Sequence, residues 1–363
     1  MSDTDFFTEE VKKETKTEHE KCPNCGNNLK FNPKTQKLFC EYCDTSVDFK
    51  QNSNYRELDI RTAFVTEMNS WDDSAKVFAC ANCGAQVVLE KTETASSCPF
   101  CGTPHVLPTK EHAGLKPNVV VPFCVDKESA VENLKKWAKR KFFAPRKFKK
   151  TFLPEKLSGV YMPCFTFDTD TSSTYDGKIG IHRTRTVGSG KNRRTETWTE
   201  WRYIRGTFNR FFDDITITAA SKLDQKSLDK LGGYSSTNNR VYDDSYLFGF
   251  MAYRNERSVE DCWQEARQDV DSILRKEILS QYRHDVVAYL NVGTVHQGVT
   301  YKYSLLPVYV GNYKYGKKIY NFVSNGVTGV STGKYPLSPI RVGGFVGFLA
   351  ALAVGIAMLI MYL

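Results

Sequence analysis

The sequence predicts an α+β protein that carries two N-terminal zinc ribbons, a central α+β domain with antiparallel strands, and one C-terminal transmembrane helix. Three observations support this prediction: eight cysteines form four CxxC pairs near the N-terminus, strand-like and helix-like patterns share the middle, and residues 342–363 carry no charge. At 363 residues the chain is longer than one average domain of about 150 residues, so several modules are expected.

The composition is that of a globular protein. Hydrophobic residues make up 41% of the chain and charged residues 25%, which excludes a mostly disordered protein and a protein with many membrane spans. The formal net charge is +9, and residues 110–160 hold thirteen lysines and arginines against five acidic residues. Most of the excess positive charge therefore lies in one segment.

The expected organisation follows the order of these patterns. We predict a disordered N-terminus at 1–18, a first zinc ribbon at 19–49, a linker at 50–74, a second zinc ribbon at 75–109, an α+β domain at 110–335, and a transmembrane tail anchor at 342–363.

The paired cysteines predict two zinc sites. Within each set, fourteen residues separate one CxxC pair from the next, which is typical of a ribbon in which two turns face each other and complete a tetrahedron of thiolates. The predicted metal ligands are Cys22, Cys25, Cys40, Cys43, Cys80, Cys83, Cys98 and Cys101. Because four cysteines saturate each ion, both zinc ions are expected to be structural.

A disulfide framework is the alternative for such a cysteine pattern, and it is typical of small secreted domains. Residues 1–21 are polar and mixed in charge, so they do not resemble a secretory signal. Zinc in a reducing compartment is therefore favoured over disulfides.

Each CxxC turn is expected to close through a residue with positive φ. Gly26, Gly84 and Gly102 follow three of the pairs, and glycine adopts this conformation without strain. Asp44 follows the fourth pair and tolerates the same conformation better than most residues.

The other cysteines, Cys124, Cys164 and Cys262, stand alone among apolar residues. An isolated cysteine is more often a small buried hydrophobe than a nucleophile or a ligand. We therefore expect all three to be buried.

The central region contains both the apolar spacing typical of helices and the alternation typical of strands. Apolar spacing predicts helices at Lys127–Phe143 and Val259–Tyr282, the second with Ser258 as N-cap. Alternation over residues 158–212 around a polar, glycine-rich stretch at 188–192 predicts a long hairpin, and strand-like sequence returns from Val286 to Val330.

A basic stretch interleaved with aromatic residues lies at the end of the first predicted helix. Its cations are a candidate anionic-binding surface that could contact lipid headgroups, nucleic acid or only solvent. Membrane is favoured over nucleic acid because the same chain carries an apolar anchor. The cations are Lys135, Lys136, Lys139, Arg140, Lys141, Arg146, Lys147, Lys149 and Lys150.

The last 22 residues, Val342–Leu363, predict about 33 Å of helix, enough to span a bilayer. Lysines and arginines precede this span and no charge follows it, so we expect a single-pass tail anchor in the plasma membrane with the N-terminal portion cytoplasmic. Small residues recur every four positions and offer a face for a helix–helix partner: Gly343, Gly347, Ala351 and Gly355.

Short strings that match enzyme motifs lack the neighbouring residues that those motifs require. Ser331 lies in a GxSxG string, but Pro336 and Pro339 break the helix that a nucleophile elbow requires, and no acidic residue or histidine follows. The chain has no phosphate-binding loop. The acidic pairs Asp168 with Asp170, Asp213–Asp214 and Asp243–Asp244 are candidates for a hard cation without an obvious further ligand. We expect no enzymatic activity.

Several short sequence motifs resemble those of a family of bacterial zinc-ribbon membrane proteins. Besides the ribbons, they are Val121-Pro122-Phe123, Lys141-Phe142-Phe143-Ala144-Pro145, Gly159-Val160-Tyr161-Met162-Pro163, Thr166-Phe167-Asp168, Gly206-Thr207-Phe208, Phe211-Phe212-Asp213-Asp214, Ser221-Lys222-Leu223-Asp224, Leu306-Pro307-Val308-Tyr309 and Asn325-Gly326-Val327-Thr328-Gly329. Members are often labelled TFIIB-type or PriA-like. Some are encoded beside phage-shock-type and SPFH (flotillin-like) proteins, which implies a membrane scaffold in envelope stress.

The sequence therefore predicts a non-enzymatic, tail-anchored adaptor whose ribbons and α+β domain recruit protein partners, with SPFH and phage-shock-type proteins as the implied partners. The alternative is a membrane-tethered nucleic-acid-binding protein without helicase activity.

Overall fold

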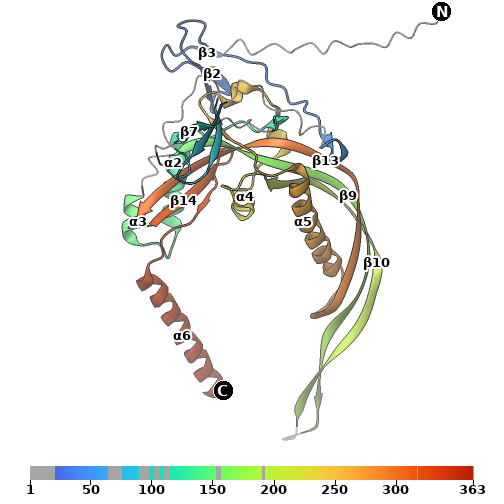
Figure 1. Cartoon of the computed structure of the whole chain (residues 1–363). Helices are drawn as coiled ribbons and strands as arrows, with labels where there is room; N and C mark the ends of the chain where they lie inside the picture. The colour runs from blue at the N-terminus through green and yellow to red at the C-terminus, as the bar shows by residue number, and fades with distance from the viewer. Residues whose placement is uncertain are drawn as a thin grey trace, which may run out of the picture.

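The computed structural model describes residues 21–63, 76–89, 98–101, 103, 106–109, 115–152, 157–189, 193–316 and 318–362. Within these residues the protein is a mixed α+β structure with one sheet of twelve strands and one of three strands, which confirms the predicted class. Figure 1 shows long strands that curve away from a body, with the N-terminal sheet and the C-terminal helix at opposite ends of that body.

Three very long strands form the spine of the large sheet. They are β9 (Ser158–Val187), β10 (Arg194–Thr218) and β13 (Val286–Tyr315), and β9 pairs antiparallel with both of the others. The hairpin predicted from the sequence is confirmed, although residues 190–192 of its turn lie outside the described residues. The turn end of this hairpin, residues 181–187 of β9 and the facing start of β10, projects beyond β13 as a two-stranded arm (Figure 1).

Helix α5 (Val259–Ser280) lies against the concave face of these strands (Figure 1). The sequence prediction of this helix and its N-cap is confirmed, because the Ser258 hydroxyl accepts a hydrogen bond from the Asp261 amide at 3.1 Å. Its apolar side chains recur every three or four residues and are buried against the sheet. They are Val259, Cys262, Trp263, Ala266, Val270, Leu274 and Ile278.

Replacing Ser258 with alanine is expected to lower the free energy of unfolding by about 1 kcal/mol, because the Asp261 amide then loses its acceptor at the helix N-terminus. Urea denaturation of the full chain would measure this loss. Ser280→Ala at the other end of α5 is the matched control, because that hydroxyl only donates to the Glu277 carbonyl. Equal effects of the two substitutions would contradict a capping role.

The remaining strands of the large sheet are short. They are β4 (Leu58–Asp59), β5 (Lys76–Cys80), β6 (Gln86–Leu89), β7 (Val106–Thr109), β8 (Val119–Val120), β11 (Arg240–Val241), β12 (Met251–Tyr253), β14 (Lys318–Asn325) and β15 (Ser331–Gly333). The main path runs β11-β8-β13-β9-β12-β6-β5-β7, with β10 beside β9, β4 and β14 beside β13, and β15 beside β14.

The small sheet and the short helices complete the body. The sheet contains β1 (Lys30–Asn32), β2 (Lys37–Phe39) and β3 (Ser46–Val47). Helix α4 is Gln225–Leu231, and the 3-10 turns are η1 (Ile60–Thr62), η3 (Ser236–Asn238) and η4 (Asp244–Leu247).

Both N-terminal cysteine segments are joined to the body. Strand β6 of the second segment pairs with β12, and β4, which lies in the predicted linker, pairs with β13. The division into domains stays a prediction, but these pairings mean that the second cysteine segment and the linker contribute strands to the central sheet.

The first predicted helix, Lys127–Phe143, is shorter than expected. Helix α2 spans Lys127–Arg140, and a separate helix α3 (Arg146–Thr151) follows. The prediction was wrong at its end because Lys141 leaves the helical conformation, with ψ 100°, and Pro145 disfavours a helical conformation at the residue before it. We call the bend between the helices, residues 141–145, the corner.

Helix α6 (Pro339–Tyr362) forms the C-terminal end and begins three residues before the predicted span. Proline suits the first turn of a helix, where its missing amide hydrogen has no partner to lose. Within the described residues, α6 is the one helix long and apolar enough to cross a membrane, and its apolar stretch is not buried in the protein.

Candidate metal centres

Four turns of the same backbone geometry carry the predicted cysteine ligands. In the first, the Cys22 amide donates to the Asn27 carbonyl at 2.7 Å, and the Gly26 amide donates back to the Cys22 carbonyl at 2.8 Å. The outer hydrogen bond recurs from the Cys40 amide to Thr45, from Cys80 to Ala85 and from Cys98 to Thr103.

The predicted positive φ angles are present where the structure describes them. Gly26 has φ +75°, Gly84 +70° and Asp44 +56°. Gly102 lies outside the described residues. The aspartate therefore takes the place of glycine at the second turn without a change in the turn.

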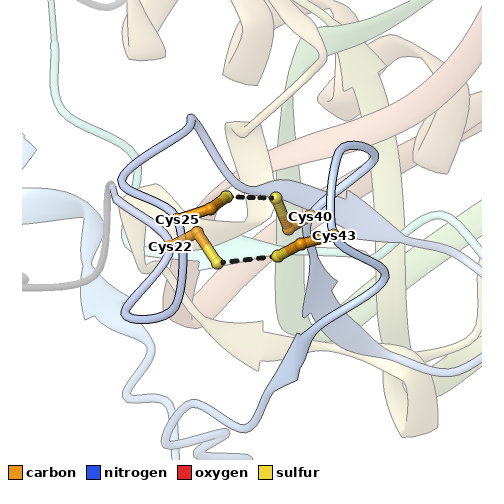
Figure 2. A group of neighbouring side chains, drawn as sticks. All are labelled: Cys22, Cys25, Cys40 and Cys43. Atoms are coloured by element: carbon orange, nitrogen blue, oxygen red, sulfur yellow. Dashed lines mark hydrogen bonds between the residues drawn. The ribbon is translucent and has the colours of Figure 1, made fainter.

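The turns bring the sulfur atoms together in two groups of four. In Figure 2 the Cys22 Sγ lies 3.5 Å from that of Cys43, and the Cys25 Sγ lies 3.5 Å from that of Cys40. The matching distances in the second group are 3.6 Å (Cys80 to Cys101) and 3.7 Å (Cys83 to Cys98).

These distances match the edges of a metal-centred tetrahedron. Metal–sulfur bonds of about 2.3 Å give sulfur–sulfur edges of about 3.8 Å. All ligand atoms in each group lie within 4.8 Å of one another. The two groups are therefore compatible with two metal ions, one each.

Polar neighbours favour the thiolate form of Cys43 in the first group, whereas burial and the neighbouring sulfur atoms raise the pKa of Cys25 to about 12. The Thr45 hydroxyl lies 3.1 Å from the Cys43 Sγ, and this contact together with the Thr45 backbone amide lowers the pKa of Cys43 to about 6. Asn27 Nδ2 donates to the Cys25 Sγ at 3.7 Å. Because a metal binds thiolate rather than thiol, the donors around Cys43 support ion binding at this sulfur.

Each group also has a fixed contact with the body. The Phe31 amide in β1 donates to the Phe248 carbonyl at 2.9 Å, and the Phe31 ring packs edge-on against Tyr246. In the second group, Lys222 Nζ donates to the Cys83 carbonyl at 2.6 Å. The metal-compatible groups are therefore held against the central structure.

Two of the three isolated cysteines are buried as predicted. Cys164 and Cys262 have no exposed surface. The prediction was wrong for Cys124, which is exposed. Its neighbour Phe123 points into the core, and in extended chain successive side chains point to opposite sides.

The nine predicted cations gather on one surface around α2, the corner and α3. All nine are exposed or partly exposed. Among the described residues, the eight cations other than Lys147 have no ion-pair partner. The aromatic residues between them divide: Phe148 is buried, Trp137 and Phe143 are partly buried, and Phe142 is 64% exposed.

A buried lysine is the feature that the sequence analysis missed. Lys302 in β13 is 1% exposed, and its Nζ lies 2.5 Å from Asp214, 3.1 Å from Glu57 and 3.9 Å from Asp168. Burial by itself would lower the pKa of Lys302, but the hydrogen bond to Asp214 and the charge of Asp168 raise it above its usual value. The Lys302 ammonium group therefore lies beside Asp168 and Asp214, two of the carboxylates considered as ligands of a hard cation.

A β-bulge builds this cluster. Strand β10 shifts register between Phe212 and Ile215, and Asp214 within the bulge has φ +57°. Its amide donates to the Asp168 carboxylate at 2.7 Å while its side chain reaches Lys302. The Asp213–Asp214 pair inside strand-like sequence is the local signal that could have indicated the bulge.

Other candidate residues have local roles. The Asp243 side chain accepts from the Ser245 amide at the start of η4, and Ser331 in β15 donates to the Ser324 hydroxyl at 3.0 Å. Gly343, Gly347, Ala351 and Gly355 all lie on α6, and nothing lies within 4 Å of a Cβ built on the three glycines. A helix–helix partner stays a prediction.

The fold and the site define a class: an α+β protein with two four-cysteine groups compatible with metal ions and one helix suited to crossing a membrane. Over 326 residues the chain is 28% identical to "Uncharacterized protein YdjG" of Bacillus subtilis (strain 168), which covers 90% of this chain and 92% of YdjG. No protein-family model and no solved structure matches the chain. The resemblance to the zinc-ribbon membrane family stays a prediction, and the function is argued from the site.

Proposed function

We propose that the protein is a non-enzymatic, single-pass membrane adaptor that presents a long curved sheet to protein partners at the cytoplasmic face of a plasma membrane. The observation that carries this proposal is the outer face of β9, β10 and β13, opposite α5. On this face, β10 and β13, the two strands that flank β9, expose large apolar side chains. They are Trp201, Tyr203, Phe211, Tyr289 and Val295.

Strand register places these side chains in rows. Tyr203 and Tyr289 lie on either side of Lys178, whose Nζ lies 5.3 Å from the Tyr203 ring centre. Two rows further along, the small residues Thr207, Thr174 and Gly293 stand side by side. Aromatic residues beside a small-residue row are typical of protein-binding surfaces, because a partner side chain can enter the recess between the rings.

An open hollow of about 610 Å³ lies at this row of small residues. It is lined by Thr174, Tyr175, Asp176, Arg205, Gly206, Thr207, Asn291 and Gly293. Its mixed lining, with Arg205 opposite Asp176, suits a polar or charged side chain of a partner. Figure 1 shows the arm and α6 extending from the body to the same side.

Zinc is the metal that we assign to both cysteine groups, and its role is structural. Four thiolates saturate a tetrahedral ion and leave no position for water or substrate. A reducing cytosol keeps these thiols free, and the lysines and arginines that precede α6 favour the same side of the membrane. SPFH and phage-shock-type proteins are the first partners to test.

Nucleic acid is the second candidate partner, because the nine cations around α2 and α3 form a concentrated positive surface. The adjacent start of α6 favours lipid over nucleic acid for this surface. A gel shift at physiological salt that is lost in Lys135→Glu/Lys139→Glu would support the nucleic-acid alternative.

Photo-crosslinking of the full chain in bacterial membranes tests the adaptor proposal. Tyr203, which is 75% exposed, is replaced by a photoreactive phenylalanine analogue, and exposed Lys226 on α4 is the control position. We expect discrete protein adducts from position 203 that Trp201→Ser and Phe211→Ser remove. No adducts at position 203, or the same adducts from position 226, would contradict a docking face on β9–β10–β13.

A further inference from the structure

Helix α6 is fixed to the corner between α2 and α3. The Ser338 amide donates to the Phe143 carbonyl at 2.8 Å, just before α6 begins. Arg341 Nη1 in the first turn donates to the carbonyl oxygens of Phe142 at 2.7 Å and Ala144 at 3.0 Å. These hydrogen bonds join residues almost two hundred positions apart, so the place where α6 leaves the body is set by the corner.

A ring contact continues this attachment one turn into α6. The Phe143 ring packs edge-on against Phe345 at 5.3 Å, and Phe142 packs edge-on against Phe143 at 5.2 Å. Phe142 and Phe143 therefore enlarge the apolar surface at the start of α6.

Large apolar side chains around this junction are open to solvent. Phe142 is 64% exposed, Leu337 59% and Ile340 86%. Apolar side chains grouped at the start of a membrane helix are stabilised when they enter the boundary between headgroups and acyl chains.

The cations stand directly beside this apolar group. Lys141 in the corner lies over the Trp137 ring at 4.8 Å and near the Tyr335 ring at 5.7 Å. Lys149 donates to the Lys139 carbonyl at 3.0 Å, and burial together with the Arg341 charge lowers the pKa of Lys149. Like charges are thus crowded together, and an anionic partner would relieve their repulsion.

The length of α6 sets the depth of this junction in a bilayer. Its 24 residues form about 36 Å of helix, while the hydrocarbon core is about 30 Å thick. The first turn, including Arg341, therefore lies in the headgroup layer when α6 spans the membrane. Because the corner is bonded to this turn, the corner lies in the same layer.

We propose that α2, the corner and α3 form a lipid-binding collar: Phe142 and Ile340 enter the acyl boundary, and the surrounding lysines and arginines bind the phosphates of anionic lipid headgroups. This inference rests on the proposed membrane span. The collar fixes the body on the membrane surface and keeps the first cysteine ribbon, at the opposite end of the body in Figure 1, turned toward the cytosol.

The test uses the full chain in lipid nanodiscs that contain phosphatidylcholine alone or a mixture with phosphatidylglycerol. Hydrogen exchange of residues 135–152 is measured at about 0.05 M and about 0.5 M salt, because screening weakens headgroup attraction. We expect slower exchange in the anionic discs, and less slowing at high salt. Alkaline extraction of the same discs reports separately whether α6 is inserted.

Two variants with the same change of charge separate the collar from general charge effects. Lys135→Glu/Lys139→Glu alters the collar, whereas Lys226→Glu/Lys230→Glu alters exposed lysines of α4. Since each cation near an anionic leaflet contributes a several-fold effect, we expect the collar variant to lose about tenfold or more of the lipid-dependent slowing. The α4 variant should behave like the unaltered chain.

The outcomes distinguish the two proposals. Extraction of the protein at alkaline pH overturns both the membrane span and the collar. Retention in the membrane with the same exchange in both lipids, or with the same loss in both variants, overturns the collar alone. Protection of residues 135–152 by single-stranded DNA in neutral discs at physiological salt would also overturn it.

Discussion

Replacing Cys98 with serine is expected to remove one of the two zinc ions that we propose for each chain, and to unfold the sheet edge formed by β5, β6 and β7. Binding of a structural zinc ion contributes on the order of 10 kcal/mol to folding. This is comparable to the whole stability of a typical domain, about 5–15 kcal/mol. The three strands are too short to compensate for such a loss with their own core.

The damage is expected to spread beyond the metal group. Cys98 is buried in one apolar cluster with Val87, Tyr253 and Val308, and β6 pairs with β12. Loss of the ion therefore removes packing from the edge of the central sheet as well as from the second cysteine segment.

Metal analysis of purified full-length protein under reducing conditions provides the measurement. The unaltered chain should hold two zinc ions and the Cys98→Ser variant one, with a lower midpoint of thermal unfolding. Cys124→Ser is the matched control, because that cysteine is exposed and outside both groups, and it should keep two ions. Four sulfur ligands also suit iron, so a chain that holds iron would contradict the zinc assignment.

Replacing Lys302 with methionine is expected to lower the free energy of unfolding by about 3–5 kcal/mol, because it leaves three carboxylates without their buried cation. Methionine retains a similar volume, so lost packing contributes little. Denaturation of the full chain at neutral pH measures this cost. A loss below about 1 kcal/mol, the range of an exposed ion pair, would contradict the buried cluster.

Asp168→Asn is the matched variant at the same cluster, because an amide oxygen can still accept from the Asp214 amide. Burial and the neighbouring Glu57 carboxyl raise the pKa of Asp168 to about 7. The unfolded chain ionises this carboxyl near pH 4, so its contribution makes the folded state less stable as pH rises from about 4 to about 7. The asparagine variant should lack this fall and gain stability relative to the unaltered chain above about pH 7.

Denaturation at several pH values between about 4 and 8 compares the two proteins. The same change with pH in both would show that Asp168 does not titrate in this range.

Features with a local cause were predictable from the sequence. The CxxC turns need only neighbouring residues and a positive φ at Gly26 or Asp44. Helix α5 follows from apolar spacing and the Ser258 cap, and the long hairpin follows from alternation. The apolar helix α6 follows from an uncharged run, although its start shifted to Pro339.

Features with a non-local cause were missed or misjudged. Lys302 stands in an alternating strand, and the sequence could not indicate that Glu57, from a predicted linker, would cover it. The burial of Cys124 was predicted from its apolar neighbours, but the side to which it points depends on the strand beside it. The early end of α2, by contrast, had a local signal, because Pro145 disfavours a helical conformation at the residue before it.

The sequence by itself determined the ligands of two metal-compatible groups, the α+β class and an apolar helix at the C-terminus, because each depends on the spacing of residues within one segment. Only the tertiary structure decided what these parts are attached to. The register of β9, β10 and β13 gathered aromatic residues on one face and carboxylates around Lys302, and Arg341 joined the basic corner to α6. Such contacts depend on how distant segments pack, and local periodicity carries no information about that packing.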